Sequence, residues 1–192
     1  MLPCRSMSLR AHARATIVGK VILVAGLLLI LSRSAGASEF EAFARSDQVA
    51  ASDLILVARV LSVHSEWAAD RSAIHTDAEL LIDAVWKGSP DGDRVVVRNP
   101  GGTVDGIASR IDGAAEFTVG ERVLVFLKRR GAEFEPLGMR FGKYEIVGSG
   151  ADASLVGNLP PAVTAAQKFE QVSLRLDEVR GEIAALVAKE RR

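Results

Sequence analysis

The sequence has few cysteines, histidines and aromatic residues, and its charges balance. Its 192 residues include one Cys, three His, seven Phe, two Trp and one Tyr, and 24 Lys and Arg balance 24 Asp and Glu. One cysteine cannot build a disulfide framework or a thiolate zinc site. A net charge of zero lacks the basic surplus that is typical of nucleic-acid binding. What is present, 48% hydrophobic and 25% charged residues, is typical of a globular chain.

A basic and then apolar segment opens the chain and predicts a signal peptide over residues 1–37. This segment carries five Lys or Arg and no acidic residue, and its apolar run covers residues 21–31. The run is too short to cross a bilayer, and Ala35, Gly36 and Ala37 after it fit a cleavage site. We therefore expect an exported protein, periplasmic or secreted. The alternative is an uncleaved leader, which would be the chain's contact with a membrane.

Removal of residues 1–37 would change the composition of the remaining chain. It would leave 155 residues with a net charge of −5, no cysteine, and two histidines, His64 and His75. Such a chain favours binding over catalysis, because it holds few of the side chains that serve as nucleophiles and general bases. The acidic charge also argues against nucleic acid as a partner.

Short strands separated by turn residues dominate the middle of the sequence. Leu54–Val63 is an almost continuous apolar run, typical of a strand that is buried on both faces or covered by a helix. Ala73–Lys87 alternates and has one apolar face, as expected for a half-buried antiparallel strand. Further strands are predicted along the chain at residues 94–98, 103–111, 122–127, 134–137 and 143–147.

Helices are predicted on both sides of these strands. A short helix is expected within residues 38–53, and residues 148–163, rich in Gly, Ala, Ser and Pro, are interpreted as a linker. Residues 164–192 predict an amphipathic helix with a heptad-like apolar seam. We expect it to dock on its own domain, which leaves a monomer, or to form a weak dimer. The seam residues are Phe169, Val172, Leu176, Val179, Ile183 and Leu186.

The predicted fold class is therefore mainly β. We expect a small antiparallel barrel of five to seven strands over residues 54–147. It would be similar to an oligonucleotide/oligosaccharide-binding (OB) barrel, with a short N-terminal helix and a longer C-terminal helix. A β-sandwich is the alternative.

Motifs spread over residues 45–147 resemble a family of exported bacterial proteins of uncharacterised function. The weaker likeness is to the barrel of tissue inhibitors of metalloproteases and netrin modules, which implies the same fold and a secreted protease as a class of partner. Their inhibitory mechanism does not carry over, because it needs an N-terminal cysteine that residues 38–192 lack. The motifs are Trp86-Lys87-Gly88, Gly101-Gly102, Phe117-x-x-Gly120-Glu121-Arg122 and Gly142-Lys143-Tyr144, and the weaker likeness rests on Thr76, Lys87-Gly88 and Gly120-Glu121.

Four residues are predicted to contact a protein partner through the barrel loops. Trp67 lies in a polar segment that we interpret as a loop, and aromatic side chains are enriched at interface hot spots. Gly101 and Gly102 form a turn after a strand, and Ile107 follows in the next segment. The sequence thus favours a non-enzymatic binding module, with an envelope-tethered structural protein as one alternative.

A metal-dependent hydrolase is the other alternative. His75, Asp77 and Glu79 alternate along one strand and share a face, where they could hold a divalent cation with His64 or Glu66 nearby. The competing interpretation is a solvated polar face. No cofactor other than such an ion is expected.

Two charged motifs receive structural interpretations. Glu121 is expected to accept hydrogen bonds from nearby backbone amides. The basic run Lys128, Arg129 and Arg130 is expected to form a solvated hairpin tip rather than a nucleic-acid contact.

Overall fold

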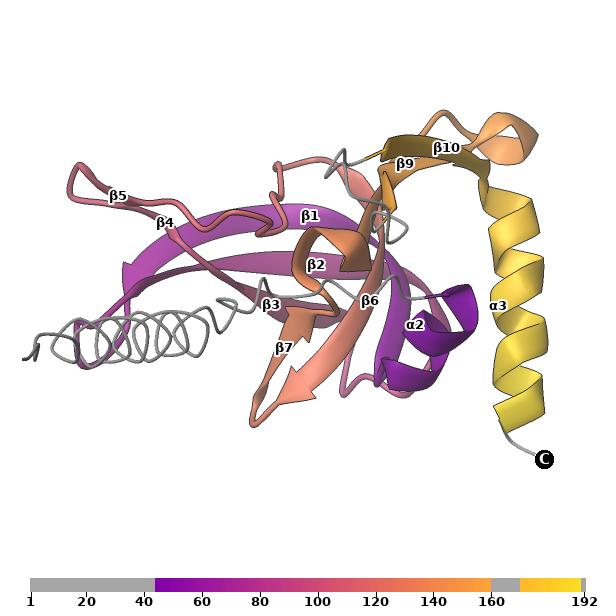
Figure 1. Ribbon diagram of the computed structural model, residues 1–192, viewed down its shortest axis with the longest axis horizontal. Helices are drawn as coiled ribbons and strands as arrows, with labels where there is room; N and C mark the ends of the chain where they lie inside the picture. The colour runs from indigo at the N-terminus through magenta and orange to yellow at the C-terminus, as the bar shows by residue number, and fades with distance from the viewer. Residues whose placement is uncertain (1–43, 160–169, 191–192) are drawn as a thin grey trace, which may run out of the picture. The chain divides into compact units, whose positions relative to one another are not determined.

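The computed structural model describes residues 44–159 and 170–190 (Figure 1). The predicted signal peptide lies outside these residues, as do residues 38–43 of the first predicted helical region. The described chain is mainly β, with a short helix before the strands and a longer helix after them. The predicted fold class is therefore confirmed.

Strands follow one another along most of the described chain. Among the described elements, one α-helix precedes the strands and one follows them. In sequence the elements are α2 (Arg45–Ala51), β1 (Leu54–Trp67), β2 (Ile74–Lys87), β3 (Arg94–Pro100), β4 (Gly102–Val104), β5 (Ile107–Ser109), β6 (Arg122–Arg130), β7 (Glu133–Pro136), η1 (Met139–Gly142), β8 (Lys143–Val147), η2 (Gly150–Asp152), β9 (Ser154–Leu159), β10 (Glu170–Arg175) and α3 (Leu176–Glu190).

Five of the strands pair in a ring. β1 pairs antiparallel with both β2 and β6, β2 pairs with β3, and β6 pairs with β7. The ring returns through β3 and β7, whose parallel contact is the single pair Val97 and Phe134. Because that contact is so short, the ring is a partly open barrel, as OB folds are. The pairing order therefore favours the predicted barrel over the β-sandwich.

Two apolar clusters meet on β1 and β6 and bury both faces of these strands. Leu56 and Val125 belong to the cluster inside the ring, to which β2, β3 and β7 also contribute. Ile55 and Phe126 belong to a second cluster, which includes residues of α2, β8, β9 and α3. Alternate residues of one strand thus enter different cores, which explains the continuous apolar run that the sequence shows.

β8, β9 and β10 extend the sheet beyond β6, and here the structure corrects two predictions. The predicted linker 148–163 contains β9, where Leu155 is fully buried and Gly157 lies against the Tyr144 ring. The small residues of this segment suggested a loop, yet Gly157 is needed because a side chain there would meet the ring. The predicted helix 164–192 begins only at Leu176, because residues 170–175 pair with β9.

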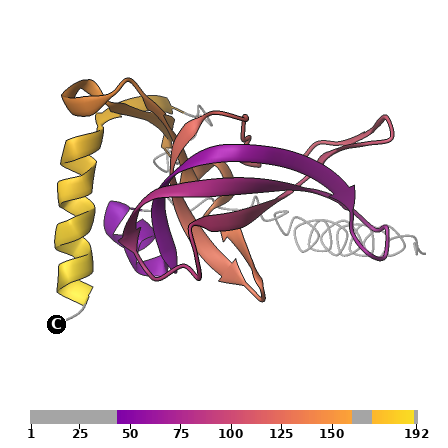
Figure 2. The same cartoon turned by 180° about the vertical axis from the view of Figure 1, so that it is seen from behind.

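α3 docks on its own domain, as predicted, and lies beside α2 (Figure 2). Val179 and Ile183 of the predicted seam are buried in the outer cluster, and Leu176 and Leu186 are partly buried against it. Ion pairs of 3.6 Å from Arg45 to Glu182 and of 2.7 Å from Lys87 to Glu190 join α3 to α2 and β2. Phe169 lies outside the described residues, and Val172 belongs to β10. Within the described ranges, no helix combines the length and apolarity needed to cross a membrane.

The segment 103–111, predicted as one strand, folds into the β4–β5 hairpin instead. Asp105 and Gly106 have φ angles of 51° and 78°, which makes a two-residue turn with positive φ at both central positions. Asp-Gly is a strong hairpin signal, so the turn was readable in the sequence. The hairpin, the C-terminal end of β1 and the N-terminal end of β2 extend in the same direction, away from α3 (Figures 1 and 2).

Candidate functional site

The chain crosses from β3 to β4 at Gly101 and Gly102, close to β1 and β2. The Gly101 N–H donates to the Ile74 carbonyl at 2.9 Å, and the Thr76 hydroxyl donates to the Gly101 carbonyl at 2.7 Å. Gly102 has a φ of 139°, and a side chain there would collide with the hydroxyls of Thr76 and Ser65. Both glycines therefore fix the path of the chain, because only glycine allows this conformation and this approach.

A groove of about 410 Å³ lies beside this crossover. Its volume falls within the range of roughly 300–1,000 Å³ that is common for ligand pockets. The β4–β5 hairpin forms one part of its lining and the segment between β5 and β6 another. Residues that line it include Gly101, Gly102, Ala108, Ser109, Ile111 and Phe117.

Asn99 lines the same groove and is 3% exposed. Asn99 shares its strand face with the buried residues Val95 and Val97. The alternation of β3 therefore places the Asn99 amide on the buried face of the strand. Its Nδ2 donates to the Ala115 carbonyl at 2.6 Å, while its Oδ1 has no hydrogen-bond partner among the described residues. A buried acceptor without a donor costs about 1–3 kcal/mol.

Ile107 lies at the start of β5 and is 55% exposed. It stands next to Ala108 in sequence but is not among the residues that line the groove. Among the described residues, β5 pairs only with β4, so its other edge offers unpaired backbone groups. An exposed apolar residue on an unpaired edge is a place where another chain can add.

Trp67 is the last residue of β1 and not part of a loop, which corrects its predicted setting. It pairs with Ile74 of β2 and is half-buried, and the Arg71 guanidinium lies 5.9 Å from the centre of its ring. Trp67 does not line the groove. The structure therefore brings Gly101 and Gly102 together in the groove, places Ile107 next to it, and leaves Trp67 outside its lining.

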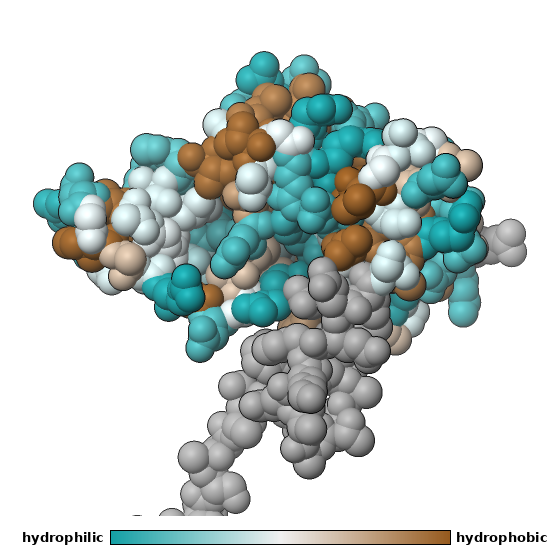
Figure 3. Space-filling model, turned by 90° about the horizontal axis from the view of Figure 1, so that it is seen from above, coloured by the Kyte–Doolittle hydropathy of each residue, from teal (hydrophilic) through white to brown (hydrophobic). Residues whose placement is uncertain are grey.

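Apolar side chains on the visible face are scattered rather than continuous. Figure 3 shows hydrophobic residues in several small groups that polar residues separate. Ile107, Ile111 and Val119, at 55%, 42% and 62% exposure, are the exposed large apolar residues of the hairpin and of the segment between β5 and β6. The face visible in Figure 3 thus carries small apolar groups and no broad apolar patch.

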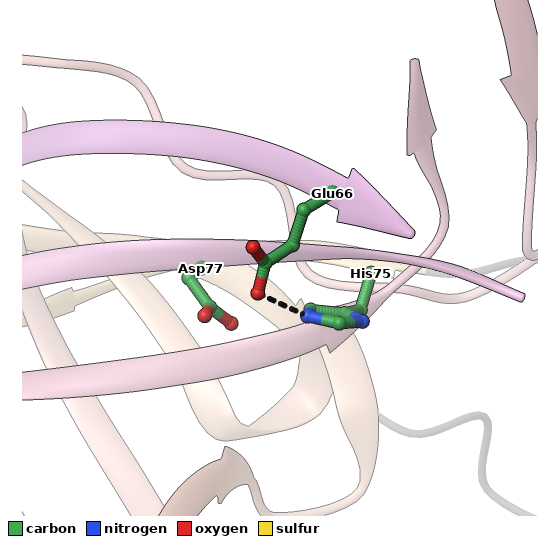
Figure 4. A group of neighbouring side chains, drawn as sticks. All are labelled: Glu66, His75 and Asp77. Atoms are coloured by element: carbon green, nitrogen blue, oxygen red, sulfur yellow. Dashed lines mark hydrogen bonds and ion pairs between the residues drawn. The ribbon is translucent and has the colours of Figure 1, made fainter. Parts of the chain in front are cut away.

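A second group of side chains lies on β1 and β2, where Glu66 and His75 face each other across the strands (Figure 4). The His75 Nε2 and the Glu66 Oε1 are 2.9 Å apart. Glu66, His75 and Asp77 each offer a ligand atom, and these atoms all lie within 4.8 Å of one another. Nitrogen and carboxylate ligands at such distances can hold a divalent cation.

Glu79, the third predicted metal ligand, lies apart from this group. It accepts a hydrogen bond of 2.9 Å from Arg94 on β3. A strand rises about 3.3 Å per residue, so four residues separate His75 and Glu79 by about 13 Å. One ion cannot reach both, and Glu66 on the neighbouring strand takes the place of Glu79. His64 is not part of the group.

The Arg98 guanidinium on β3 is the positive charge within this cluster. It donates to both Asp77 oxygens at 2.6 and 2.8 Å, and it lies 2.6 Å from Glu133 and 3.4 Å from Glu66. The hydrogen bond to Asp77, with the charges of Glu133 and Glu66, raises the pKa of Arg98. One guanidinium thus serves three carboxylates, which leaves the group with a surplus of negative charge.

The charged motifs outside these groups have structural partners. Glu121 accepts a hydrogen bond from the Thr118 amide at 3.1 Å, as predicted, and also pairs with the nearly buried Lys143. In the basic run, Lys128 pairs with Asp53 and Arg130 with Glu135, each at 3.3 Å. The Arg129 guanidinium lies 4.4 Å from the centre of the Phe134 ring. The run therefore forms the last three residues of β6, paired with β7, and the turn itself begins after it at Gly131, which corrects the prediction that the run is the hairpin tip.

The sequence did not single out Asn99, and it placed Glu79 with His75 and Asp77 while naming Glu66 only as a nearby residue. The residues 94–99 contain a usable signal for Asn99, because it follows Val95 and Val97 at a spacing of two. Glu66 could not replace Glu79 without the register between β1 and β2, which is unbroken from the turn between Trp67 and Ile74 to the pair of Glu66 and His75. Comparison with protein-family models and with curated proteins finds no match for this chain. The resemblances in residues 45–147 therefore stay predictions.

Proposed function

We propose that this protein is a non-enzymatic binding module that holds a segment of a partner protein in the groove beside the β3–β4 crossover. The observation that carries the proposal is a groove of about 410 Å³ lined in part by β5, a strand with one edge unpaired among the described residues. A volume of this size suits a short extended segment better than a flat contact between folded domains.

The surroundings of the groove support a polypeptide ligand. Ala108 and Ser109 of β5, a strand that pairs only with β4 among the described residues, line the groove, and Phe117 and Ile111 add apolar surface. Backbone pairing gives affinity in such sites, and apolar contacts select side chains. The predicted export and the predicted likeness to protease inhibitors make a secreted protease one class of partner that we propose.

The test is selection of peptides from a random displayed library on the immobilised protein, followed by measured dissociation constants. Ala108→Trp, which fills the groove at β5, should weaken the selected peptides at least about tenfold, or about 1.4 kcal/mol. Ala84→Trp is the matched control, because Ala84 is exposed on β2 and does not line the groove. It should leave affinity within about twofold. Failure to enrich any peptide, or an equal loss in both variants, contradicts the proposal.

A second candidate function is divalent-cation binding by Glu66, His75 and Asp77. The close ligand atoms and the surplus negative charge around Arg98 favour it. An ion here would also be the starting point for the hydrolase alternative, because a bound cation lowers the pKa of its water.

Calorimetric titration with Zn²⁺ separates this cluster from the set predicted along one strand. Glu66→Gln should abolish binding, whereas Glu79→Gln should leave it unchanged, because Glu79 binds Arg94. Loss of binding in Glu79→Gln alone would favour the original set. Absence of Zn²⁺ binding to the native protein would contradict this second candidate function.

A further inference from the structure

We infer that Arg98 limits the affinity of the cation site, because its guanidinium holds the Asp77 carboxylate that a bound ion would need. This inference rests on the second candidate function, divalent-cation binding by Glu66, His75 and Asp77, and names the residue that controls how tightly the site binds. In the structure the guanidinium is the cation that these two acids contact. An incoming ion must therefore compete with it for the same carboxylates.

The contacts of Asp77 show what an ion would have to displace. The Arg98 Nε and Nη2 donate to the two Asp77 carboxylate oxygens at 2.8 and 2.6 Å. Bidentate pairing of this kind is among the stronger contacts between charged side chains. The same Nη2 lies 3.4 Å from the Glu66 Oε1, the oxygen that faces the His75 Nε2 in Figure 4. A divalent ion between the two acids would thus meet a like charge.

A third carboxylate gives the guanidinium a second anchor. Glu133 on β7 lies 2.6 Å from the Arg98 Nη1, and it is not one of the three residues that offer ligand atoms to the ion. Arg98 can therefore release Asp77 and keep a charged partner, since Glu133 holds a different nitrogen of the same group. Binding of an ion would then exchange one charge pair for another and leave no charge uncompensated.

The direction of the effect on affinity distinguishes this role from a structural one. If the guanidinium competes with the ion, Arg98→Met should strengthen Zn²⁺ binding at least about tenfold, or about 1.4 kcal/mol. If the guanidinium instead holds the carboxylates in place for the ion, the same substitution should weaken binding. Arg98→Lys keeps the positive charge but loses the bidentate contact, so its affinity should lie between those of the native protein and Arg98→Met.

Calorimetric titration of the full chain with Zn²⁺ measures these affinities, and circular dichroism checks that each variant is folded. Arg94→Met is the matched control. Arg94 is also an arginine of β3, but it pairs with Glu79 at 2.9 Å and outside the site, so its loss should change the affinity less than about twofold. Glu133→Gln removes the second anchor, and it should weaken Zn²⁺ binding more in the native protein than in Arg98→Met.

The outcomes separate the inference from the function on which it rests. If the native protein binds Zn²⁺ and Arg98→Met binds it equally or more weakly, the inference fails while cation binding stands. An equal gain in Arg94→Met, or a native affinity in Arg98→Lys, also overturns the inference, because a general effect of charge would then explain the change. If the native protein binds no Zn²⁺, the second candidate function itself fails.

Discussion

The two halves of β1 differ in what they contact. Residues 54–60 pair with β2 on one side and β6 on the other, and nearly every side chain in this half is buried. Residues 61–67 pair with β2 alone among the described strands, and exposed and partly buried side chains alternate there. β1 thus begins between two apolar clusters and ends as a partly exposed strand that is paired with β2 alone among the described strands.

This difference indicates which half of β1 is expected to determine stability and which half lies beside the candidate binding sites. In the first half, the barrel interior and the helix layer bury opposite faces, so substitutions there are expected to cost stability. In the second half, β1 and β2 are less buried. The group of Glu66, His75 and Asp77 lies on this part of the two strands, and the groove beside Gly102 lies next to it. Side chains can vary there at low cost, as is usual for binding surfaces on a rigid scaffold.

The largest expected contrast compares one residue from each region. Phe126→Ala should lower the free energy of unfolding by about 3–5 kcal/mol, because the ring is fully buried and packs edge-on against Tyr144 at 6.0 Å. Ile107→Ala should change it by less than about 0.5 kcal/mol, because Ile107 is 55% exposed. Urea denaturation monitored by circular dichroism measures both. Similar losses in the two variants would mean that the hairpin is part of the core.

Most of the barrel could be predicted from the sequence, because its strands carry distinct patterns. The apolar run at residues 54–63 lies inside β1, which continues to Trp67, and the alternation at 73–87 matches β2 to within one residue. The prediction of a linker over residues 148–163 was wrong, because small residues suggest a loop. Gly157 is small for another reason, since a side chain there would meet the Tyr144 ring. Such a contact between distant residues leaves no local signal.

The candidate sites were predictable only where one strand carries them. His75 and Asp77 were identified from their spacing, but their partner Glu66 is nine residues before His75 and faces it from the neighbouring strand. Gly101 and Gly102 were identified as a turn, although their approach to the Thr76 hydroxyl depends on the barrel. Sequence spacing describes one strand, whereas sites form between strands.

Substitution of two glycines separates the stability cost of the close contact at Gly102 from the cost of its backbone conformation. Gly102→Ala should cost about 2–3 kcal/mol, because it combines a φ of 139° with a collision against the Thr76 and Ser65 hydroxyls. Gly106→Ala is the matched control, with positive φ but open space around the added carbon, and should cost about 1 kcal/mol. Thermal unfolding of both variants measures the difference. Equal losses would show that backbone conformation alone sets the cost at Gly102.

The smallest expected effect concerns the charge at the start of the buried half of β1. The Asp53 carboxylate accepts a 2.8 Å hydrogen bond from the Arg129 amide and pairs with Lys128, and the Arg129 bond lowers the pKa of Asp53. Because the folded state holds the carboxylate ionised more strongly than the unfolded state, its contribution to stability is present above about pH 4 and is lost as the pH falls through the lowered pKa. Asp53→Asn should therefore lower the melting temperature slightly at about pH 7, and the difference from the native protein should shrink toward about pH 3. A difference that stays constant between these pH values would show that hydrogen bonding, not the charge of Asp53, stabilises the start of β1.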